Sequence, residues 1–181
     1  MCRYMTNLGL IQVYTGNGKG KTTASLGLAL RATGHNLKVC MIQFMKESDA
    51  YGEVHASKYL PNFTLIQVGR NDFVNLADPD QIDVDLAQKG WQKAKAIITS
   101  GEYDIVILDE INVAIACKLL DVNEVSAFLM RFKALPKKPE LILTGRYAPQ
   151  QIIDIADLVT EMQEIRHYYN GGTESRAGAE Y

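Results

Sequence analysis

Short apolar runs alternate with amphipathic segments along most of the chain. The apolar runs cover residues 8–14, 38–44, 63–68, 105–108, 141–144 and 158–161. Runs of this length are typical of strands, and the run at 105–108 is continuously apolar, as a strand covered on both faces of a sheet is. We therefore expect each run to form a strand.

Apolar residues at helical spacing fill the segments between these strands. The expected helices cover residues 22–32 and 80–100, a segment from Asp121 to a stop at Pro136, and a short segment after Pro149. Asp121 and Glu124 have the spacing of a capping box. This order of elements predicts an α/β fold with a mostly parallel, doubly wound sheet, whose ligand crevice lies beyond the carboxyl ends of the strands.

The length of 181 residues suits one core better than two, so we expect a single domain over residues 1–181. We expect a short N-terminal segment, 1–7, to precede the first strand and a tail, 163–181, to follow the last. Polar composition predicts an irregular surface connection over residues 45–62. The tail has no apolar period, so composition alone predicts a flexible end.

A glycine-rich segment stands between the first strand and the first helix, where a phosphate-binding loop belongs. Its residues are Thr15, Gly16, Asn17, Gly18, Lys19, Gly20, Lys21, Thr22 and Thr23. Glycines let backbone N–H groups turn toward anionic oxygens, and the helix N-terminus adds partial positive charge. Lys21 is expected to project into the crevice and reach phosphate, and the Thr22 hydroxyl to bind Mg²⁺.

The first glycine is shifted relative to the usual loop, because Thr15 occupies its place and Gly16 comes one residue late. A merely flexible turn would explain the glycines. It would not explain a lysine followed by two threonines at the start of a helix. We therefore interpret the segment as a variant P-loop.

Two acidic residues, Asp109 and Glu110, follow a buried strand, where carboxylates that hold the Mg²⁺ of a bound nucleotide are found. We expect them to share that metal with Thr22; the alternative is a helix cap. Arg146 follows the strand at 141–144, so its guanidinium could contact a triphosphate or lie on the surface as an ordinary arginine.

Charge and cysteine content exclude some classes of protein. The 19 basic and 21 acidic residues lack the cationic excess of a nucleic-acid binder. The cysteines Cys2, Cys40 and Cys117 form no Cys-x-x-Cys pair. We see no apolar stretch of the roughly 18 residues that a membrane span needs and no secretory core. A cytoplasmic protein with neither a nucleic acid nor a membrane as partner is expected.

The loop closely resembles that of the P-loop ATP:corrinoid adenosyltransferases, which act on cob(I)alamin or cob(I)yrinic acid a,c-diamide, including its shifted glycine. Further segments that agree in order are 42–44 with Lys46, 108–112, 143–146 with Ala148 and Pro149, 156–162 and 177–181. The resemblance spans nearly the whole chain, and the combination of motifs is far more specific than the loop alone.

The resemblance implies a RecA-like P-loop NTPase fold, a homodimer and ATP bound in reversed polarity. It implies transfer of the 5′-deoxyadenosyl group of ATP to the Co(I) of a corrinoid, with triphosphate released and a reductase or flavodoxin-like reductant supplying Co(I). Lys21 and Arg146 would stabilise the transition state without any acid or base. Mg²⁺, with Mn²⁺ as a second candidate, would lie on Thr22, Asp109 and Glu110.

The resemblance assigns the nucleotide to residues 16–23, with Asn17 and Lys19 holding its inverted form. The aromatic patch that meets the corrin in the family is represented by residues 69–74, which keep Phe73 but contain no tryptophan. The segment before the first strand is also shorter than the arm that covers the corrin in many members.

Two other functions stay open from the residues alone. A conventional P-loop ATPase or kinase would use Glu110 to orient a water or hydroxyl toward the γ-phosphate. A nucleotide-binding protein without catalysis, such as a corrinoid carrier, would keep the loop and lose turnover.

Overall fold

A six-stranded parallel sheet forms the centre of the chain in a computed structural model that describes residues 8–72 and 74–181. The strands are β1 (Ile11–Thr15), β2 (Val39–Phe44), β3 (Phe63–Val68), β4 (Ile105–Asp109), β5 (Glu140–Thr144) and β6 (Leu158–Glu161). Their order across the sheet is β3-β2-β4-β5-β1-β6. The mostly parallel α/β sheet predicted from the sequence is therefore confirmed, and all its described pairs are parallel.

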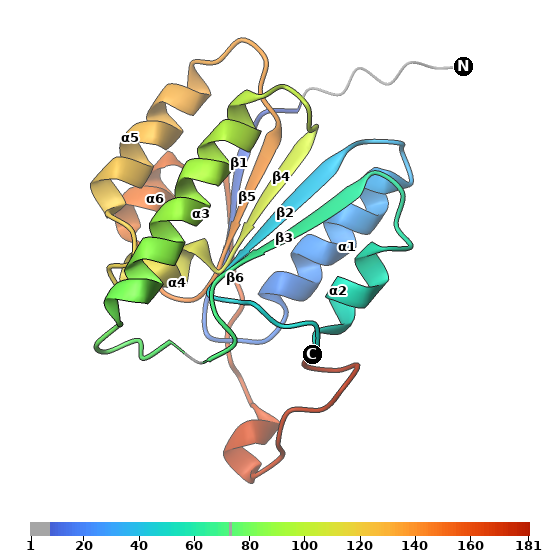
Figure 1. Ribbon diagram of the computed structural model, residues 1–181, viewed down its shortest axis with the longest axis vertical. Helices are drawn as coiled ribbons and strands as arrows, with labels where there is room; N and C mark the ends of the chain where they lie inside the picture. The colour runs from blue at the N-terminus through green and yellow to red at the C-terminus, as the bar shows by residue number, and fades with distance from the viewer. Residues whose placement is uncertain (1–7, 73) are drawn as a thin grey trace.

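Helices cover both faces of this sheet (Figure 1). They are α1 (Lys21–Thr33), α2 (Gly52–Ser57), α3 (Gln81–Thr99), α4 (Ile111–Ala116), α5 (Val122–Lys133) and α6 (Gln150–Ile155). α1 and α2 lie on one face, and α3, α4, α5 and α6 lie on the other. None of the helices in the described ranges is long and apolar enough to span a bilayer.

Two separate apolar cores hold the layers together. Because side chains alternate along a strand, Cys40 and Ile42 of β2 face the core under α3 and α5, whereas Val39 and Met41 face the core under α1. Trp91 of α3 is fully buried in the first core. Each central strand is thus buried on both faces, as its continuous apolar sequence predicts.

Two short helices were missing from the sequence prediction. α2 lies within the segment 45–62, which polar composition assigned to an irregular connection, so that assignment was wrong. α4 follows β4 directly and contains only six residues, too few to display a helical period.

The predicted capping box is half confirmed. Asp121 caps α5 by accepting a hydrogen bond from the Asn123 amide at 2.9 Å. The Glu124 carboxylate instead accepts from Trp91 Nε1 and from Lys95 Nζ, each at 2.8 Å. A tertiary contact between α5 and α3 has therefore taken the place of the second, local half of the box.

The C-terminal tail folds back beneath the carboxyl edge of the sheet, which sequence composition did not predict. It leaves β6, forms the 3₁₀ helix η1 (Tyr168–Gly171) and returns so that the chain ends beside α2 (Figure 1). The tail and the connections after β2 and β3 thus surround the edge where the strands end. That edge is where an open parallel sheet binds its ligands.

Replacing two helical glycines by alanine should change the stability of the fold in opposite directions. A Cβ on Gly27 of α1 would meet nothing within 4 Å, whereas one on Gly90 of α3 would lie 2.7 Å from Val68 Cγ2 and 3.1 Å from its Cβ. Gly27→Ala should raise the free energy of unfolding by about 0.5–1 kcal/mol, the gain expected from helix propensity. Gly90→Ala should lower it by about 1–3 kcal/mol, because a strand valine cannot move aside. Urea denaturation of both variants measures this, and equal shifts would contradict it.

Candidate active site

The glycine-rich loop connects β1 to α1 in a conformation that needs glycine at its two ends. Gly16 has φ 93° and Gly20 has φ 122°, values that side chains disfavour. Gly20 is the N-cap of α1 and offers no side chain to its first amides. Those amides therefore keep their capacity to bind an anion, and the partial positive charge of the helix end adds to the attraction.

The backbone after β6 packs against the outside of this loop. The Gly18 amide donates to the Met162 carbonyl at 2.7 Å. A Cβ on Gly16 would lie 2.4 Å from that carbonyl oxygen, and one on Gly18 would lie 2.7 Å from it. A glycine is therefore required at position 16, because a Cβ there would overlap the Met162 backbone.

Lys21 is nearly buried and folds back over the loop. Its Nζ donates to the carbonyls of Gly16 and Gly18, each at 2.7 Å. The expectation of a side chain projecting into open crevice was wrong, since only 7% of this residue is exposed. Burial, and then repulsion from the Arg146 guanidinium, lower the pKa of Lys21. An anionic oxygen would be a stronger acceptor for this ammonium than two carbonyls.

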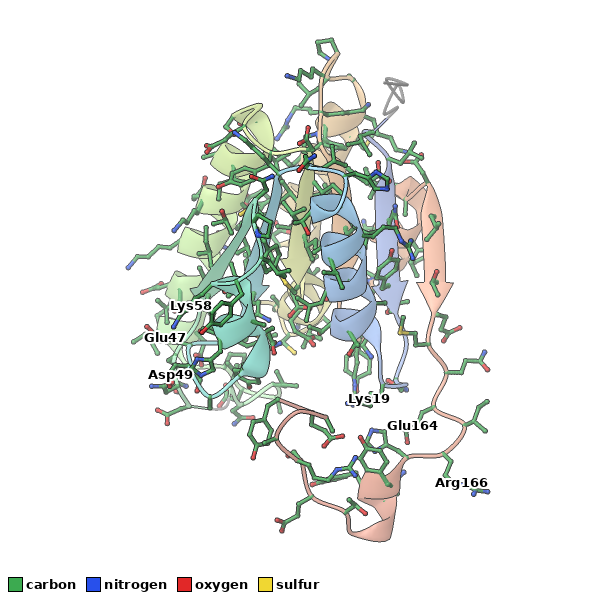
Figure 2. All side chains as sticks on the ribbon, turned by 90° about the vertical axis from the view of Figure 1, so that its right-hand side faces the viewer. Lys19, Glu47, Asp49, Lys58, Glu164 and Arg166 are labelled. Atoms are coloured by element: carbon green, nitrogen blue, oxygen red, sulfur yellow. The ribbon has the colours of Figure 1, made fainter. Side chains whose placement is uncertain are left out.

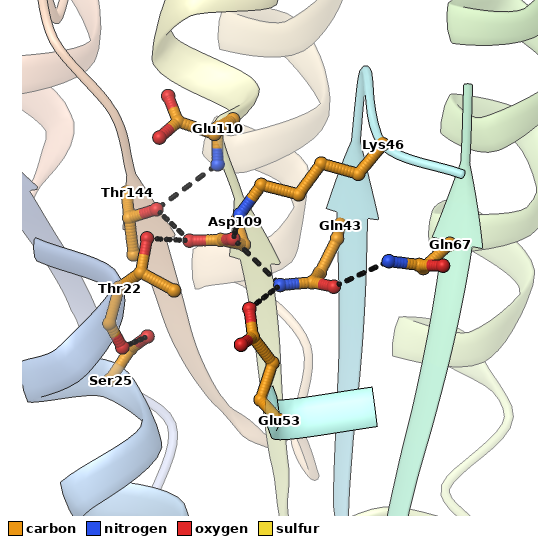
Figure 3. Close-up of polar contacts among 9 residues, drawn as sticks. All are labelled: Thr22, Ser25, Gln43, Lys46, Glu53, Gln67, Asp109, Glu110 and Thr144. Atoms are coloured by element: carbon orange, nitrogen blue, oxygen red, sulfur yellow. Dashed lines mark hydrogen bonds and ion pairs between the residues drawn. The ribbon is translucent and has the colours of Figure 1, made fainter. Parts of the chain in front are cut away.

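A fully buried carboxylate, Asp109 at the end of β4, gathers four donors (Figure 3). Its Oδ1 accepts from Thr22 Oγ1 at 2.9 Å and from Thr144 Oγ1 at 2.6 Å. Its Oδ2 accepts from Lys46 Nζ at 3.0 Å and from Gln43 Nε2 at 3.2 Å. These contacts satisfy the lone pairs of both oxygens, which a buried charge requires.

Strand order explains why these donors meet. β4 lies between β2 and β5, and all three strands end at the same edge. Gln43 is in register with Asp109, and Thr144 ends β5 beside it. Thr22 reaches the carboxylate from the first turn of α1.

Lys46, for which sequence reasoning gave no role, is the cation of this network. Burial acts to lower its pKa, but attraction to Asp109 and the hydrogen bond with it outweigh burial, so the pKa is raised and the ammonium stays charged. The signal that could have found it is its place two residues beyond β2, next to the acidic strand. Gln43 could have been found in the same way, as a polar residue in an otherwise apolar strand.

Glu110 follows Asp109 directly and is the N-cap of α4. Its backbone has φ 62°, and its amide donates to Thr144 Oγ1 at 3.0 Å. In Figure 3 its carboxylate points away from the carboxylate of Asp109. Burial, and then repulsion from Asp109, raise the pKa of Glu110.

The oxygen atoms of Thr22 and Asp109 suit a hard divalent cation such as Mg²⁺. They are adjacent, but the site is not an all-protein cage, because no group of three or more His, Cys, Asp and Glu residues within 8–72 and 74–181 could hold a metal ion. This fits Mg²⁺, which usually takes one or two protein ligands together with phosphate and water.

Three cavities meet at Tyr51, which lines each of them. One of about 430 Å³ lies between the connections after β2 and β3 and contains Lys46, Glu110 and Arg146. One of about 770 Å³ runs from Lys19 and Thr22 along an apolar wall between α1 and α2. The third, of about 820 Å³, lies above the tail and also contains Arg146.

The remaining predicted site residues divide into three groups. Arg146 is exposed, forms no ion pair with a described residue and lines two of the cavities, as a triphosphate contact would. Asn17, Lys19 and Thr23 are exposed around the loop. Phe73 lies outside the described residues.

Comparisons with known proteins agree with this architecture. The family model described as ATP:corrinoid adenosyltransferase BtuR/CobO/CobP matches residues 7–181. The corrinoid adenosyltransferase of a Sinorhizobium species is 37% identical over 174 residues, covering 96% of this chain and 80% of the relative. The corrinoid adenosyltransferase of Escherichia coli K12 is 34% identical over 173 residues, which cover 96% of this chain and 86% of the relative.

A solved structure shares the fold at lower sequence similarity. The flagellar accessory protein FlaH from Methanocaldococcus jannaschii has a TM-score of 0.57 and 18% identity, covering 85% of this chain and 71% of that one. This similarity supports the RecA-like P-loop fold and carries no information about the reaction.

The raised pKa of Glu110 predicts a pH-dependent effect of neutralising it. The folded chain holds the proton of the Glu110 carboxyl more tightly than the unfolded chain does. The free energy of unfolding therefore falls as pH rises from the ordinary pKa of glutamic acid to the raised pKa of Glu110 in the folded chain. Glu110→Gln should therefore stabilise the ligand-free chain at pH 7, by about 1 kcal/mol, and have little effect near pH 4. Urea midpoints in EDTA at the two pH values measure this. An equal gain in stability at pH 7 and near pH 4 would contradict the conclusion that burial of the Glu110 charge destabilises the chain.

Proposed function

The chain belongs to the ATP:corrinoid adenosyltransferase family, and we propose that its P-loop and the Asp109 network together position ATP for attack by a reduced corrinoid. It is an enzyme that transfers the adenosyl group of ATP to a corrinoid. The observation that carries the proposal is the convergence of Lys21, Thr22 and Lys46 on one edge of the sheet.

In the proposed reaction Co(I) of the corrinoid is the nucleophile at the ribose C5′ of ATP. A cobalt–carbon bond forms while the C5′–O bond breaks, and the electron pair of that bond leaves with inorganic triphosphate. No proton has to move in this step. The protein's contribution is therefore to hold the two substrates in line and to neutralise the charge that gathers on the triphosphate.

The loop supplies most of the binding for the triphosphate. The amides at the start of α1 offer donors, and Lys21 exchanges its two carbonyl acceptors for phosphate oxygens. Gly16, Gly18 and Gly20 allow the backbone to approach, while Asn17, Lys19 and Thr23 contact the nucleotide from the rim. The pKa of Lys21 is lowered by burial and then by the Arg146 guanidinium, which adds a further cation for the triphosphate.

Thr22 and Asp109 are proposed to hold Mg²⁺, or Mn²⁺ in its place, and Glu110 would contribute through water. When bound, the ion withdraws negative charge from the leaving triphosphate. Asp109 accepts hydrogen bonds from four donors, which hold its carboxylate in place at this edge of the sheet. With Mg²⁺ held by Asp109, the Lys46 ammonium would be available to pair with a phosphate oxygen.

The corrin is proposed to lie over the cavity of about 430 Å³. Residues 70–72 and 74 line it, within the segment that resembles the family's corrin-facing patch. Arg70 is fixed there by Asp80 at 2.5 Å and Asp83 at 2.8 Å. Glu110 and Arg146 line the same cavity, so a corrin here would face the proposed triphosphate site.

Family resemblance also supports three further proposals. We propose a homodimer, a cytoplasmic location and a reductase or flavodoxin-like partner that delivers the electron to cobalt. The resemblance carries these proposals, and no contact within the chain bears on them.

The products of the reaction test the proposed function directly. ATP and a chemically reduced cobalamin should yield adenosylcobalamin and triphosphate in equal amounts, detected by absorbance and by phosphorus NMR. ADP and phosphate as the main products would contradict the proposal and favour a conventional ATPase.

Lys21→Ala should abolish productive ATP binding with an unchanged circular dichroism spectrum, because the side chain contacts the loop rather than the core.

Removal of the Lys46 ammonium should affect chemistry more than ATP binding. Lys46→Met leaves the buried Asp109 carboxylate without its cation, so we expect kcat to fall about 10²–10³-fold and the unfolding free energy to fall by about 1–3 kcal/mol. Lys58→Met, an exposed lysine at the end of α2, is the matched control. Steady-state kinetics with saturating Mg²⁺ and ATP check this, and a kcat like that of the control would exclude a role in the reaction.

A further inference from the structure

The last residues of the chain close onto the phosphate loop. Lys19 Nζ donates to the Ala179 carbonyl at 2.6 Å and forms an ion pair with Glu180 at 3.5 Å. Figure 2 shows Lys19 beneath α1, facing the returning tail. A loop residue and a residue two positions from the end of the chain are thus in direct contact across 160 residues.

Glu180 is the residue around which this end of the chain folds. Its carboxylate accepts from the Arg176 amide at 2.7 Å, from Arg176 Nε at 3.3 Å and from Arg176 Nη2 at 3.2 Å. It also accepts from the Tyr168 hydroxyl of η1. The Arg176 guanidinium lies 4.9 Å from the centre of the Tyr168 ring. We call residues 176–181, held in this way, the C-terminal clasp.

The clasp forms a wall of the nucleotide region rather than a remote surface. Glu180 and Tyr181 line both the cavity of about 770 Å³ that begins at Lys19 and Thr22 and the cavity of about 820 Å³ that contains Arg146. A Cβ on Gly52 would lie 3.9 Å from the carbonyl carbon of Tyr181, so the clasp reaches α2 as well.

We propose that Glu180 is a positioning residue for ATP, which acts by folding the clasp and thereby holding Lys19 over the phosphate loop. The inference rests on the role given to Lys19 in the proposed function. An ammonium has three donors, so Lys19 can keep the Ala179 carbonyl while it binds a phosphate oxygen. ATP binding and closure of the clasp then stabilise each other.

Two physical features favour positioning over competition with the nucleotide. Lys19 is a long side chain with 43% of its surface exposed, so its ammonium would sample many positions without the clasp. Fixing it before ATP arrives reduces the entropy lost on binding. The negative charge of Glu180 is paired with Arg176, so the clasp presents little net repulsion to a triphosphate.

A double-mutant cycle on the full-length protein tests whether Glu180 acts through Lys19. The ATP Kd from calorimetry, together with KM and kcat for adenosylation, is measured for wild type, Lys19→Ala, Glu180→Ala and the double variant. We expect Glu180→Ala to raise the Kd and KM for ATP about five- to tenfold with kcat within about twofold. In the Lys19→Ala background, Glu180→Ala should change neither the Kd nor the KM for ATP.

Glu174→Gln is the matched control. It removes one negative charge from the same tail at an exposed residue with no hydrogen bond or ion pair to another described residue, and it should leave the ATP Kd unchanged. Hydrogen exchange supplies a second readout, because ATP should slow exchange of the amides of Gly178, Ala179 and Glu180 in wild type but not in Lys19→Ala.

The outcomes separate this inference from the proposed function. If Lys19→Ala leaves the ATP Kd unchanged, the role of Lys19 in nucleotide binding is wrong and the inference falls with it. A second set of outcomes would contradict only the positioning role of Glu180. In these, Lys19→Ala weakens ATP binding, but Glu180→Ala leaves the ATP Kd unchanged or lowers it, or the double variant shows the full sum of the two single effects.

Discussion

The burial of one carboxylate organises the catalytic edge of this enzyme. Asp109 has no exposed surface, so its charge must be balanced by neighbours rather than by water. The four groups that balance it come from α1, β5, β2 and the connection that follows β2. The same contacts therefore join the phosphate loop to the acidic strand and fix the distance between them. Loss of any one donor would leave part of a buried charge unsatisfied.

Most of the fold could be predicted because its strongest signals are local. The strand at 63–68 agrees with β3 residue for residue, and the helix at 80–100 agrees with α3 to within one residue at each end. Continuous apolar runs separated by helical stripes leave few alternatives to a parallel sheet. α2 and α4 were missed because a six-residue helix is held by its surroundings more than by its own period.

The site could be predicted only in part, because its parts lie far apart along the chain. The loop was recognisable from spacing and from its place between a strand and a helix, and the acidic pair from its place after a strand. The fold then brings Lys46 and Thr144 to Asp109, which requires knowledge of strand order. The clasp was beyond prediction from composition, since its glycines and charges show no period and its contacts join residues 160 positions apart.

The strand end at Met162 has a consequence for how the enzyme comes into being. It forms the outer support of Gly16 and Gly18, and β6 pairs with β1 at the edge of the sheet. Synthesis proceeds from the N-terminus, and long-range parallel pairing is a slow step of folding. During synthesis the phosphate loop is therefore made before the strand end that supports it. The phosphate loop reaches its final packing only after β6 has paired with β1, so its completion waits for the last strand of the sheet to be made.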